Sequence, residues 1–319
     1  GGVIRHVSAV SVALAAHGHD VRVAGPASSR GLLHEGLSLT AVEIGPRPGP
    51  RDLAAVRALR VTMSGADVVH AHGLRAGAFA VMAARTRRSR PRVVVTLHNL
   101  PVGGRAVRTV SAVLERVVAR GADAVLGVSG DLVARAVTLG ARGAERALVP
   151  APPVRPVSDD DVAAVRAELD VPGRLVLTVA RLAPQKGLDT LLDAAERLAR
   201  DVPDVTWCVA GDGPLLGETE DEIRRRSLPV RMLGARSDVA ALLRAADVVV
   251  STAVWEGQPI AVQEALGAGA ALVVTDAGGT REVTGEQGAV VVPVGDPTAL
   301  ARETAALLVD DTRRAGQGE

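Results

Sequence analysis

Aromatic residues and cysteine are scarce in this 319-residue chain, which has one phenylalanine, two tryptophans, no tyrosine and one cysteine. The single cysteine, Cys208, excludes an intramolecular disulfide and is typical of a reducing compartment. With so few aromatic rings, the core must be almost entirely aliphatic. The same shortage argues against a protein that stacks the bases of single-stranded nucleic acid.

Long apolar runs are also missing. No run reaches the roughly 18 residues that a membrane-spanning helix needs, and no secretory signal is visible. We therefore expect a cytoplasmic protein. Apolar residues nevertheless make up 47% of the chain, which excludes extensive disorder. The length suits two domains of roughly 150 residues each.

Positive charge is concentrated in one part of the chain, although the net charge is only +1. Residues 47–120 contain fourteen arginines and three acidic residues, an excess of eleven positive charges. Such a segment suggests an acidic partner: an anionic membrane surface, a phosphorylated acceptor or nucleic acid. The alternative is a solvated arginine surface. The lack of aromatic residues disfavours nucleic acid, so a solvated arginine surface and peripheral association with the inner face of a membrane both stay open.

Short apolar strands alternate with amphipathic helices along the chain. Strands are expected at residues 21–24, 67–71, 93–97, 124–128, 175–180, 205–210, 230–233, 248–251, 271–275 and 289–292. Helices are expected between them, including residues 53–63, 76–84, 107–119, 160–169 and 297–309, with a first helix carrying an apolar stripe at Val7, Val10 and Leu14 and another capped by Ser129. This alternation is typical of parallel βαβ units, whose sheets bind ligands beyond the carboxyl ends of their strands.

A proline-rich segment separates the two halves of this pattern. Residues 149–157 (VPAPPVRPV) contain four prolines and fit neither a helix nor a central strand. We therefore expect an N-terminal domain of residues 1–152 and a C-terminal domain of residues 153–319.

The turn and helix in residues 253–269 combine two carboxylates with a helix start. Glu256 and Glu264 lie eight positions apart, and Pro259 suits the first turn of the helix. Because helix N-termini attract anions, this stretch predicts a site where a phosphate meets the helix and the carboxylates hold hydroxyl groups. Two alternatives are an ordinary turn with solvated glutamates and an acid/base pair of the kind used in glycoside hydrolysis.

Three further loops of the C-terminal half follow predicted strands. Arg181 and Lys186 (ARLAPQKG) can hold a diphosphate, Arg as a fork and Lys as a point charge. The glycines of AGDGP and DAGGT let the backbone approach a ligand closely. Each loop alone also fits a plain turn with surface cations. All of them fall at the same edge of one predicted sheet, which favours a shared binding site.

Histidines end two predicted strands of the N-terminal half. His98 follows the strand VVVTL, where it is well placed to face a cleft. His70 and His72 lie on one side of their strand, a spacing that permits metal binding. No further ligand cluster is evident in the sequence, so we expect no metal.

The motifs together resemble the retaining glycosyltransferases of the GT-B fold (glycosyltransferase family 4, glycosyl transferases group 1 type). In the C-terminal half the matching stretches are VARLAPQKG, VAGDGP, MLG, AADVVVST, EGQPIAVQEALGAGA and VVTDAGGTREV. The N-terminal half is similar in its Gly-Gly turn and in GHDVRVAG, DVVHAHG, VVVTLHN and ADAVLGVSG. The resemblance implies two Rossmann-like doubly wound parallel-sheet domains that face a cleft, the N-terminal one on the acceptor side.

The resemblance also implies roles for individual residues. Arg181 and Lys186 would neutralise the leaving diphosphate of a UDP- or GDP-linked sugar, without a metal or other cofactor. Glu264 would hold the ribose hydroxyls, Glu256 the 3- and 4-hydroxyls of the sugar, and His98 would hydrogen-bond that sugar. Further donor contacts would come from Gly2, Gly211, Gly213, Gly234, Gly257, Gln258, Pro259, Ile260, Gly278, Gly279 and Thr280. The acceptor would be a glycan, lipid-linked or small molecule.

The chain departs from the family pattern at three places. It begins at the Gly-Gly turn, so the first strand of the N-terminal domain is expected to be missing, and it ends before the usual segment that crosses back to that domain. Gln258 replaces the usual aromatic residue after Glu256-Gly257. Two alternatives to a transferase therefore stay open: a sugar-nucleotide epimerase on the same fold, and a catalytically impaired homologue that binds a nucleotide sugar.

Overall fold

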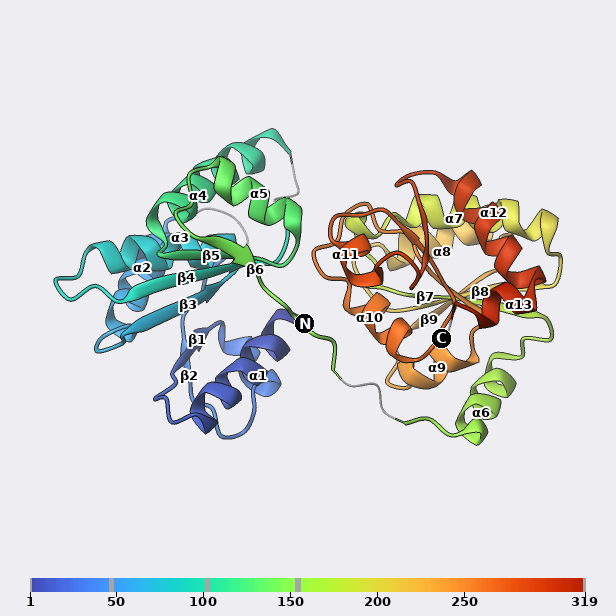
Figure 1. The fold of residues 1–319 in the computed structure, drawn as a ribbon, viewed down its shortest axis with the longest axis horizontal. Helices are drawn as coiled ribbons and strands as arrows, with labels where there is room; N and C mark the ends of the chain where they lie inside the picture. Colours follow the sequence, from blue (N-terminus) through green and yellow to red (C-terminus); the bar gives the residue numbers. More distant parts are fainter. Residues whose placement is uncertain (1, 46–48, 101–103, 153–155, 318–319) are drawn as a thin grey trace. The chain divides into compact units, whose positions relative to one another are not determined.

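The chain separates into two compact units, an N-terminal unit of Gly1–Val149 and a C-terminal unit of Pro150–Glu319 (Figure 1). The computed structural model describes residues 2–45, 49–100, 104–152 and 156–317. The sequence places the domain boundary after residue 152, inside the proline-rich segment. Gly1 of the predicted Gly-Gly turn and residues 153–155 of that segment lie outside the described residues.

The N-terminal unit contains a four-stranded parallel sheet in the order β3-β4-β5-β6. Its strands are β3 (Val68–His72), β4 (Arg92–Leu97), β5 (Ala124–Gly127) and β6 (Ala144–Arg146). A separate parallel pair joins β1 (Val23–Gly25) to β2 (Leu39–Ala41). The two strands that the sequence did not predict, β2 (LTA) and β6 (AER), are three residues long and contain polar or charged residues, so they show no apolar run.

Helices connect the strands of the N-terminal unit. They are α1 (Gly2–Ala16), the 3₁₀ turn η1 (Ala27–Leu32), α2 (Arg51–Thr62), α3 (Leu74–Arg85), α4 (Arg105–Gly121) and α5 (Gly130–Thr138). The predicted apolar stripe of α1 is not its buried face, because α1 buries Ser8 and Ser11 while Leu14 is 41% exposed. The Ser8 hydroxyl accepts the backbone N–H of His34 at 2.9 Å, which explains why a polar residue faces inward.

Two expected helix starts differ in detail from the prediction. Ser129 occupies the position before α5, but its hydroxyl donates to the carboxylate of Asp131 and accepts no backbone N–H as a cap. Pro259 lies one residue before helix α10 (Ile260–Gly267) and not in its first turn, with the extended angles φ −71° and ψ 99°.

The C-terminal unit is built on a six-stranded parallel sheet in the order β12-β11-β10-β7-β8-β9. Its strands are β7 (Arg174–Val179), β8 (Val205–Ala210), β9 (Val230–Gly234), β10 (Val248–Ser251), β11 (Leu272–Thr275) and β12 (Val290–Val292). The central strands are continuous apolar runs because both of their faces are buried.

Helices cover both faces of this sheet (Figure 1). One face packs against α7 (Leu188–Asp201), α8 (Leu216–Arg226) and α12 (Pro297–Val309), and the other against α6 (Asp159–Leu169), α9 (Val239–Ala245) and α10. Alternate residues of β7 divide between the two cores, Val176 on the first and Leu175 and Leu177 on the second. The predicted fold class, two α/β units with parallel sheets, is thus confirmed.

The carboxyl-terminal tail is more ordered than the sequence suggested. After α12 the structure has a short helix, α13 (Asp311–Ala315), begun by Asp310, whose side chain accepts the backbone N–H of Arg313 at 2.9 Å. The sequence predicts no element after the helix at residues 297–309, because five residues with a single alanine carry no apolar period.

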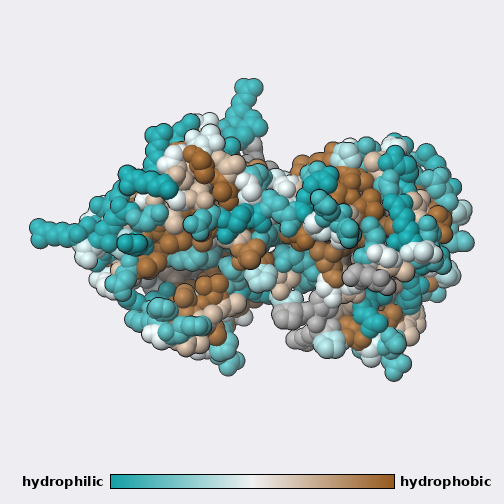
Figure 2. Space-filling view, in the orientation of Figure 1, coloured by the Kyte–Doolittle hydropathy of each residue, from teal (hydrophilic) through white to brown (hydrophobic). Residues whose placement is uncertain are grey.

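The surface of the N-terminal unit is mixed: Figure 2 shows hydrophilic residues with apolar patches between them. Val61 at the end of α2 is 74% exposed, and Val107, Val110 and Val113 of α4 are also exposed. No helix within the described ranges combines the length and apolar character needed to cross a lipid bilayer.

Candidate donor site

The loops after β7 and β10 are locked together at the carboxyl edge of the six-stranded sheet. The backbone carbonyl of Lys186, in the 3₁₀ turn η2 (Pro184–Lys186), accepts the Thr252 hydroxyl at 2.7 Å, and the carbonyl of Gln185 accepts the N–H of Val254 at 2.9 Å. Gly187 has a φ of +62°, and a Cβ at this position would collide with the carbonyl oxygen of Thr252. The close approach of the two loops therefore depends on glycine.

This interlocking brings Lys186 and Glu256 into an ion pair. The Lys186 ammonium contacts the Glu256 carboxylate, and the two side chains are only 21% and 16% exposed. Lys186 is also the only lysine in the sequence, in a chain whose other cationic residues are all arginines. The presence of a single lysine therefore marks Lys186 in the sequence, independently of the spacing of the motifs. The pair places a positive and a negative group side by side at the edge of the sheet.

Arg181 supplies a second positive charge just beyond the end of β7. Its side chain is exposed, and it takes part in no ion pair within the ranges that the structure describes. An arginine without a carboxylate partner keeps its donors available for an anion.

The loop between β11 and α11 (Thr280–Thr284) packs directly on Glu256. The Gly279 N–H donates to the Glu256 carbonyl at 2.8 Å, and Gly278 has a φ of +54°. A Cβ at Gly278 would collide with that carbonyl and lie 2.8 Å from the Trp255 Nε1 atom. Thr280 is buried, and its hydroxyl donates to the Ala277 carbonyl at 2.7 Å, so that hydroxyl has a structural partner.

The predicted donor glycines after β8, Gly211 and Gly213, pack against the β7 loop. Gly211 has a φ of +149° and donates its N–H to the Gly234 carbonyl at 2.7 Å. Side chains at Gly211 and Gly213 would collide with the carbonyl oxygens of Ala180 and Leu182. The close packing of the loops therefore explains why both positions are glycine. The same contacts hold the β7 loop in place.

Helix α10 begins at the same edge. Gly257 and Pro259 are buried, Gln258 and Ile260 are partly exposed, and Ile260 is the first residue of the helix. Glu264 lies about one helical turn further on and is partly exposed. Its carboxylate is thus carried by the helix that starts next to the Lys186–Glu256 pair.

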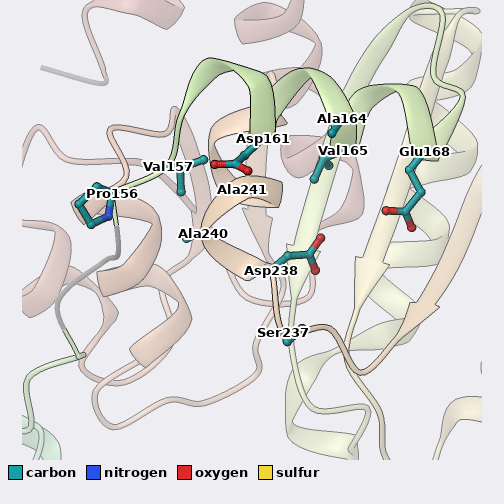
Figure 3. A pocket seen from close by; sticks show the side chains of 10 residues that line it. All are labelled: Pro156, Val157, Asp161, Ala164, Val165, Glu168, Ser237, Asp238, Ala240 and Ala241. Carbon is teal, nitrogen blue, oxygen red and sulfur yellow. The ribbon is translucent and has the colours of Figure 1, made fainter.

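A hollow of about 370 Å³ in the C-terminal unit lies elsewhere, between α6 and α9 (Figure 3). It is lined by Asp161, Glu168 and Asp238, with alanines and Val165 between them, and by none of the predicted site residues. Two of these carboxylates, Glu168 and Asp238, bind Arg236, which lowers the pKa of each. Its acidic lining does not suit a diphosphate.

The N-terminal unit holds the predicted His98 in a cluster of histidines. His98 follows β4, and its Nε2 lies 3.1 Å from Nδ1 of His72 in β3. The rings of His70 and His72 are 4.2 Å apart, and His6 of α1 lies 5.6 Å from His72 and 6.1 Å from His98. The sequence did not point to His6, because nothing in the periodicity of α1 marks it as a neighbour of β3. Gly2, the other predicted residue of this unit, is the exposed first residue of α1.

Burial keeps these imidazoles neutral. It lowers the pKa of His72 to about 3 and that of His98 to about 4, and neighbouring histidines lower both pKa values further. Within the described ranges, no group of three or more His, Cys, Asp or Glu residues is arranged to hold a metal ion. The cluster is therefore a set of neutral hydrogen-bonding groups near pH 7.

Family models match both units. The model described as "Glycosyl transferase 4-like domain" matches residues 1–152, and the one described as "Glycosyl transferases group 1" matches residues 173–310.

Curated relatives match the chain to different extents. A phosphatidyl-myo-inositol mannosyltransferase of Mycobacterium leprae is 29% identical over 98% of this chain and 85% of that protein. The UDP-Gal:alpha-D-GlcNAc-diphosphoundecaprenol alpha-1,3-galactosyltransferase of Escherichia coli is 32% identical over 32% of this chain. The matched segment spans only 28% of that galactosyltransferase and 38% of a phosphatidyl-myo-inositol mannosyltransferase of Mycolicibacterium smegmatis.

Solved structures share the fold. Anabaena HepE, determined with UDP and glucose, has a TM-score of 0.80 at 22% identity, covering 99% of this chain and 88% of that one. Sucrose-phosphate synthase of Thermosynechococcus elongatus has a TM-score of 0.72 at 20% identity, with 88% and 76% covered. Both units match family models and the whole chain matches the fold, so this protein belongs to the GT-B glycosyltransferases of the glycosyl transferases group 1 type.

Proposed function

We propose that this protein transfers a hexosyl group from a UDP- or GDP-linked sugar to an acceptor, with retention of the anomeric configuration. The observation that carries the proposal is the Lys186–Glu256 pair, formed where the loops after β7, β10 and β11 interlock. It sets a cation for a diphosphate beside a carboxylate for sugar hydroxyls. Membership of the family and the UDP bound in the HepE structure support a nucleotide-sugar donor.

The charges suit the bond changes of glycosyl transfer. The bond between the anomeric carbon and the diphosphate oxygen breaks, so negative charge grows on the diphosphate and positive charge on the sugar. Lys186 and the unpaired Arg181 would stabilise the leaving diphosphate. The acceptor oxygen bonds to the anomeric carbon from the same face, and its proton passes to the diphosphate. No protein nucleophile is required in this scheme.

The remaining predicted residues would hold the donor. Glu256 would bind the sugar 3- and 4-hydroxyls and Glu264 the ribose hydroxyls, while His98 and Gly2 of the N-terminal unit would contact the sugar and the diphosphate. We propose that the two cations make a metal unnecessary. Turnover that survives treatment with EDTA is the expected result, and loss of turnover that Mg²⁺ or Mn²⁺ restores would refute this point.

The arginine-rich N-terminal unit supports a lipid-linked acceptor at an anionic membrane surface. Arg57, Arg60, Arg105 and Arg108 are exposed, and exposed valines lie on the same helices, α2 and α4. Basic and apolar side chains together favour binding to anionic lipid. We expect co-sedimentation with phosphatidylglycerol vesicles that weakens with salt. Equal binding to phosphatidylcholine vesicles would contradict an electrostatic attachment.

Titration of UDP- and GDP-sugars by calorimetry tests the donor site. We expect one class of donor to bind, Glu264→Ala to weaken that binding, and Lys186→Met to reduce turnover by about 10²- to 10³-fold, as for loss of one charge-stabilising group. Arg200→Met is a matched control, because Arg200 is an exposed cation on α7. Failure of every nucleotide sugar to bind, or near-normal turnover in both site variants, would refute the proposal.

Analysis of the products separates the alternatives. A transferase yields a nucleoside diphosphate and a glycosylated acceptor or, without acceptor, free sugar. An epimerase would convert the donor into its epimer without releasing the transferred sugar. A donor that binds with neither outcome would identify an impaired homologue.

A further inference from the structure

The backbone of the N-terminal unit sets His72 and His98 side by side. In the parallel register of β3 and β4, His72 is the partner of Thr96, and His98 follows two positions later. The N–H of Gly73, directly after His72, donates to the Thr96 carbonyl at 2.8 Å. The two imidazoles are stacked with an interplanar angle of 27°, and His72 Nδ1 lies 3.1 Å from His98 Nε2. The pairing of the strands thus holds two ring nitrogens at hydrogen-bond distance.

A hydrogen bond between two neutral imidazoles couples the positions of their protons. Each neutral ring carries one N–H and one lone pair, so one of the facing nitrogens must donate and the other must accept. Both rings are neutral near pH 7, since burial lowers the pKa values of His72 and His98. The bond occupies Nε2 of His98, which leaves Nδ1 as the atom available to a ligand.

We infer that His72 is a positioning residue for His98: its hydrogen bond to Nε2 fixes the orientation of the His98 ring and ties the His98 tautomer to that of His72. The inference rests on the proposed function, in which His98 hydrogen-bonds the transferred sugar. A sugar hydroxyl can donate or accept, so it can bind Nδ1 in either tautomer, provided that the ring is held in one orientation. His72 holds the ring in that orientation from outside the site.

His70 provides a matched control on the same strand. Its ring packs 4.2 Å from that of His72, but its Nε2 pairs with the Thr96 hydroxyl at 2.7 Å. His70→Phe therefore removes a neighbouring histidine and a side-chain hydrogen bond without removing the His72–His98 bond. His72→Phe keeps an aromatic ring and removes that bond, whereas His72→Asn keeps a polar atom near the position of Nδ1.

Nitrogen NMR of the full chain with ¹⁵N-labelled histidine tests the inference directly. Long-range ¹H–¹⁵N correlations distinguish the two neutral tautomers, and a His98→Gln variant identifies the His98 signals by their loss. We expect His70→Phe to keep the His98 tautomer populations of the wild type, and His72→Phe to change them. The same His98 tautomer population in the wild type and in His72→Phe would overturn the inference.

Kinetics supply the second readout, with release of UDP or GDP from the bound donor as the measurement. His72→Phe should lower kcat by about 3- to 10-fold, the range expected for one lost hydrogen bond, with donor KM unchanged. His72→Asn should recover part of the loss, and His70→Phe should keep the wild-type kcat. An equal loss of kcat in His70→Phe and His72→Phe would overturn the inference in favour of simple packing.

The two readouts separate this inference from the proposed function. If His98→Ala turns over normally, the proposed contact between His98 and the sugar fails, and the NMR result alone decides whether His72 controls the His98 tautomer. If no nucleotide sugar binds, the proposed function fails while the NMR measurement still applies.

Discussion

One methyl group at Gly278 should disturb the candidate donor site without altering any of its charged groups. In Gly278→Ala the new Cβ would collide with the Glu256 carbonyl and lie 2.8 Å from Trp255 Nε1. The Glu256 carbonyl accepts the Gly279 N–H at 2.8 Å, so the collision separates two loops at their point of contact. The loop that carries Glu256 must therefore move.

Two terms contribute to the size of the effect. Alanine in the left-handed conformation of Gly278, with φ +54°, costs about 1–2 kcal/mol. Overpacking adds about 1–3 kcal/mol. If the displaced loop must return to its original place when a donor binds, the overpacking term alone weakens affinity by about 5- to 150-fold.

Gly295→Ala is the matched control, because Gly295 has a φ of +73° and a Cβ there would meet nothing within 4 Å. This substitution has the free-energy cost of placing alanine in the left-handed conformation, but it creates no collision. Calorimetric titration with UDP and GDP measures the affinity of both variants. Tryptophan fluorescence reports the loop, since Trp207 is fully buried in the core and Trp255 lies beside Gly278.

We expect Gly278→Ala to shift the tryptophan emission and to bind nucleotide more weakly than Gly295→Ala. Unchanged emission together with equal nucleotide affinities in the two variants would refute the argument that the loops after β10 and β11 form one rigid wall.

Two further predictions concern stability. Because the folded-state pKa values of His72 and His98 lie below the ordinary histidine pKa of 6.5, the unfolded chain binds more protons below that pH. The stability is therefore fully present above pH 6.5, and below that pH it should fall by up to about 1.4 kcal/mol per pH unit for each histidine, down to about pH 4. Thermal melts by circular dichroism at pH 7, 6 and 5 should show this acid sensitivity. A His72→Phe/His98→Phe double variant should show less of it, while burial of His6 and His70, whose pKa values are also lowered, leaves a remainder. Parallel melts of the two proteins would contradict the prediction. Asp247→Ala should cost about 1–3 kcal/mol, because the Asp247 carboxylate is 11% exposed and accepts the Leu175 N–H at 2.8 Å, whereas its partners Arg166 and Arg174 are 37% and 36% exposed and stay solvated; a loss under about 1 kcal/mol in urea unfolding would show that water replaces these partners.

Sequence patterns predicted the elements that are buried on both faces. The runs at Val205–Ala210 and Val248–Ser251 were predicted with the same ends as in the structure, because a central parallel strand is apolar at most of its positions. Strands β2 and β6 were missed because each has only three residues and some of these are polar or charged, which leaves no apolar run. The local sequence pattern was therefore enough to predict the strands that are buried on both faces.

The candidate site could be predicted only in part. Strand ends placed Lys186 and Glu256 at one edge of the sheet, but their mutual pairing depends on how two loops interlock through Gly187 and Thr252. In the same way, the bond between His72 and His98 depends on the register of β3 against β4. Such contacts arise from tertiary structure, and spacing along one chain does not encode them.

The presence of one lysine gives this chain an unusual chemical property. Arginine carries every other cationic side chain, and guanidinium groups do not react with the reagents that acylate or reductively methylate amines. Lys186 is therefore the sole side-chain amine that such reagents can label. Its ammonium contacts Glu256, so any anion that displaces Glu256 changes the surroundings of one known atom and with them the labelling rate there. The native protein thus carries its own single-site reporter of what occupies this edge of the sheet.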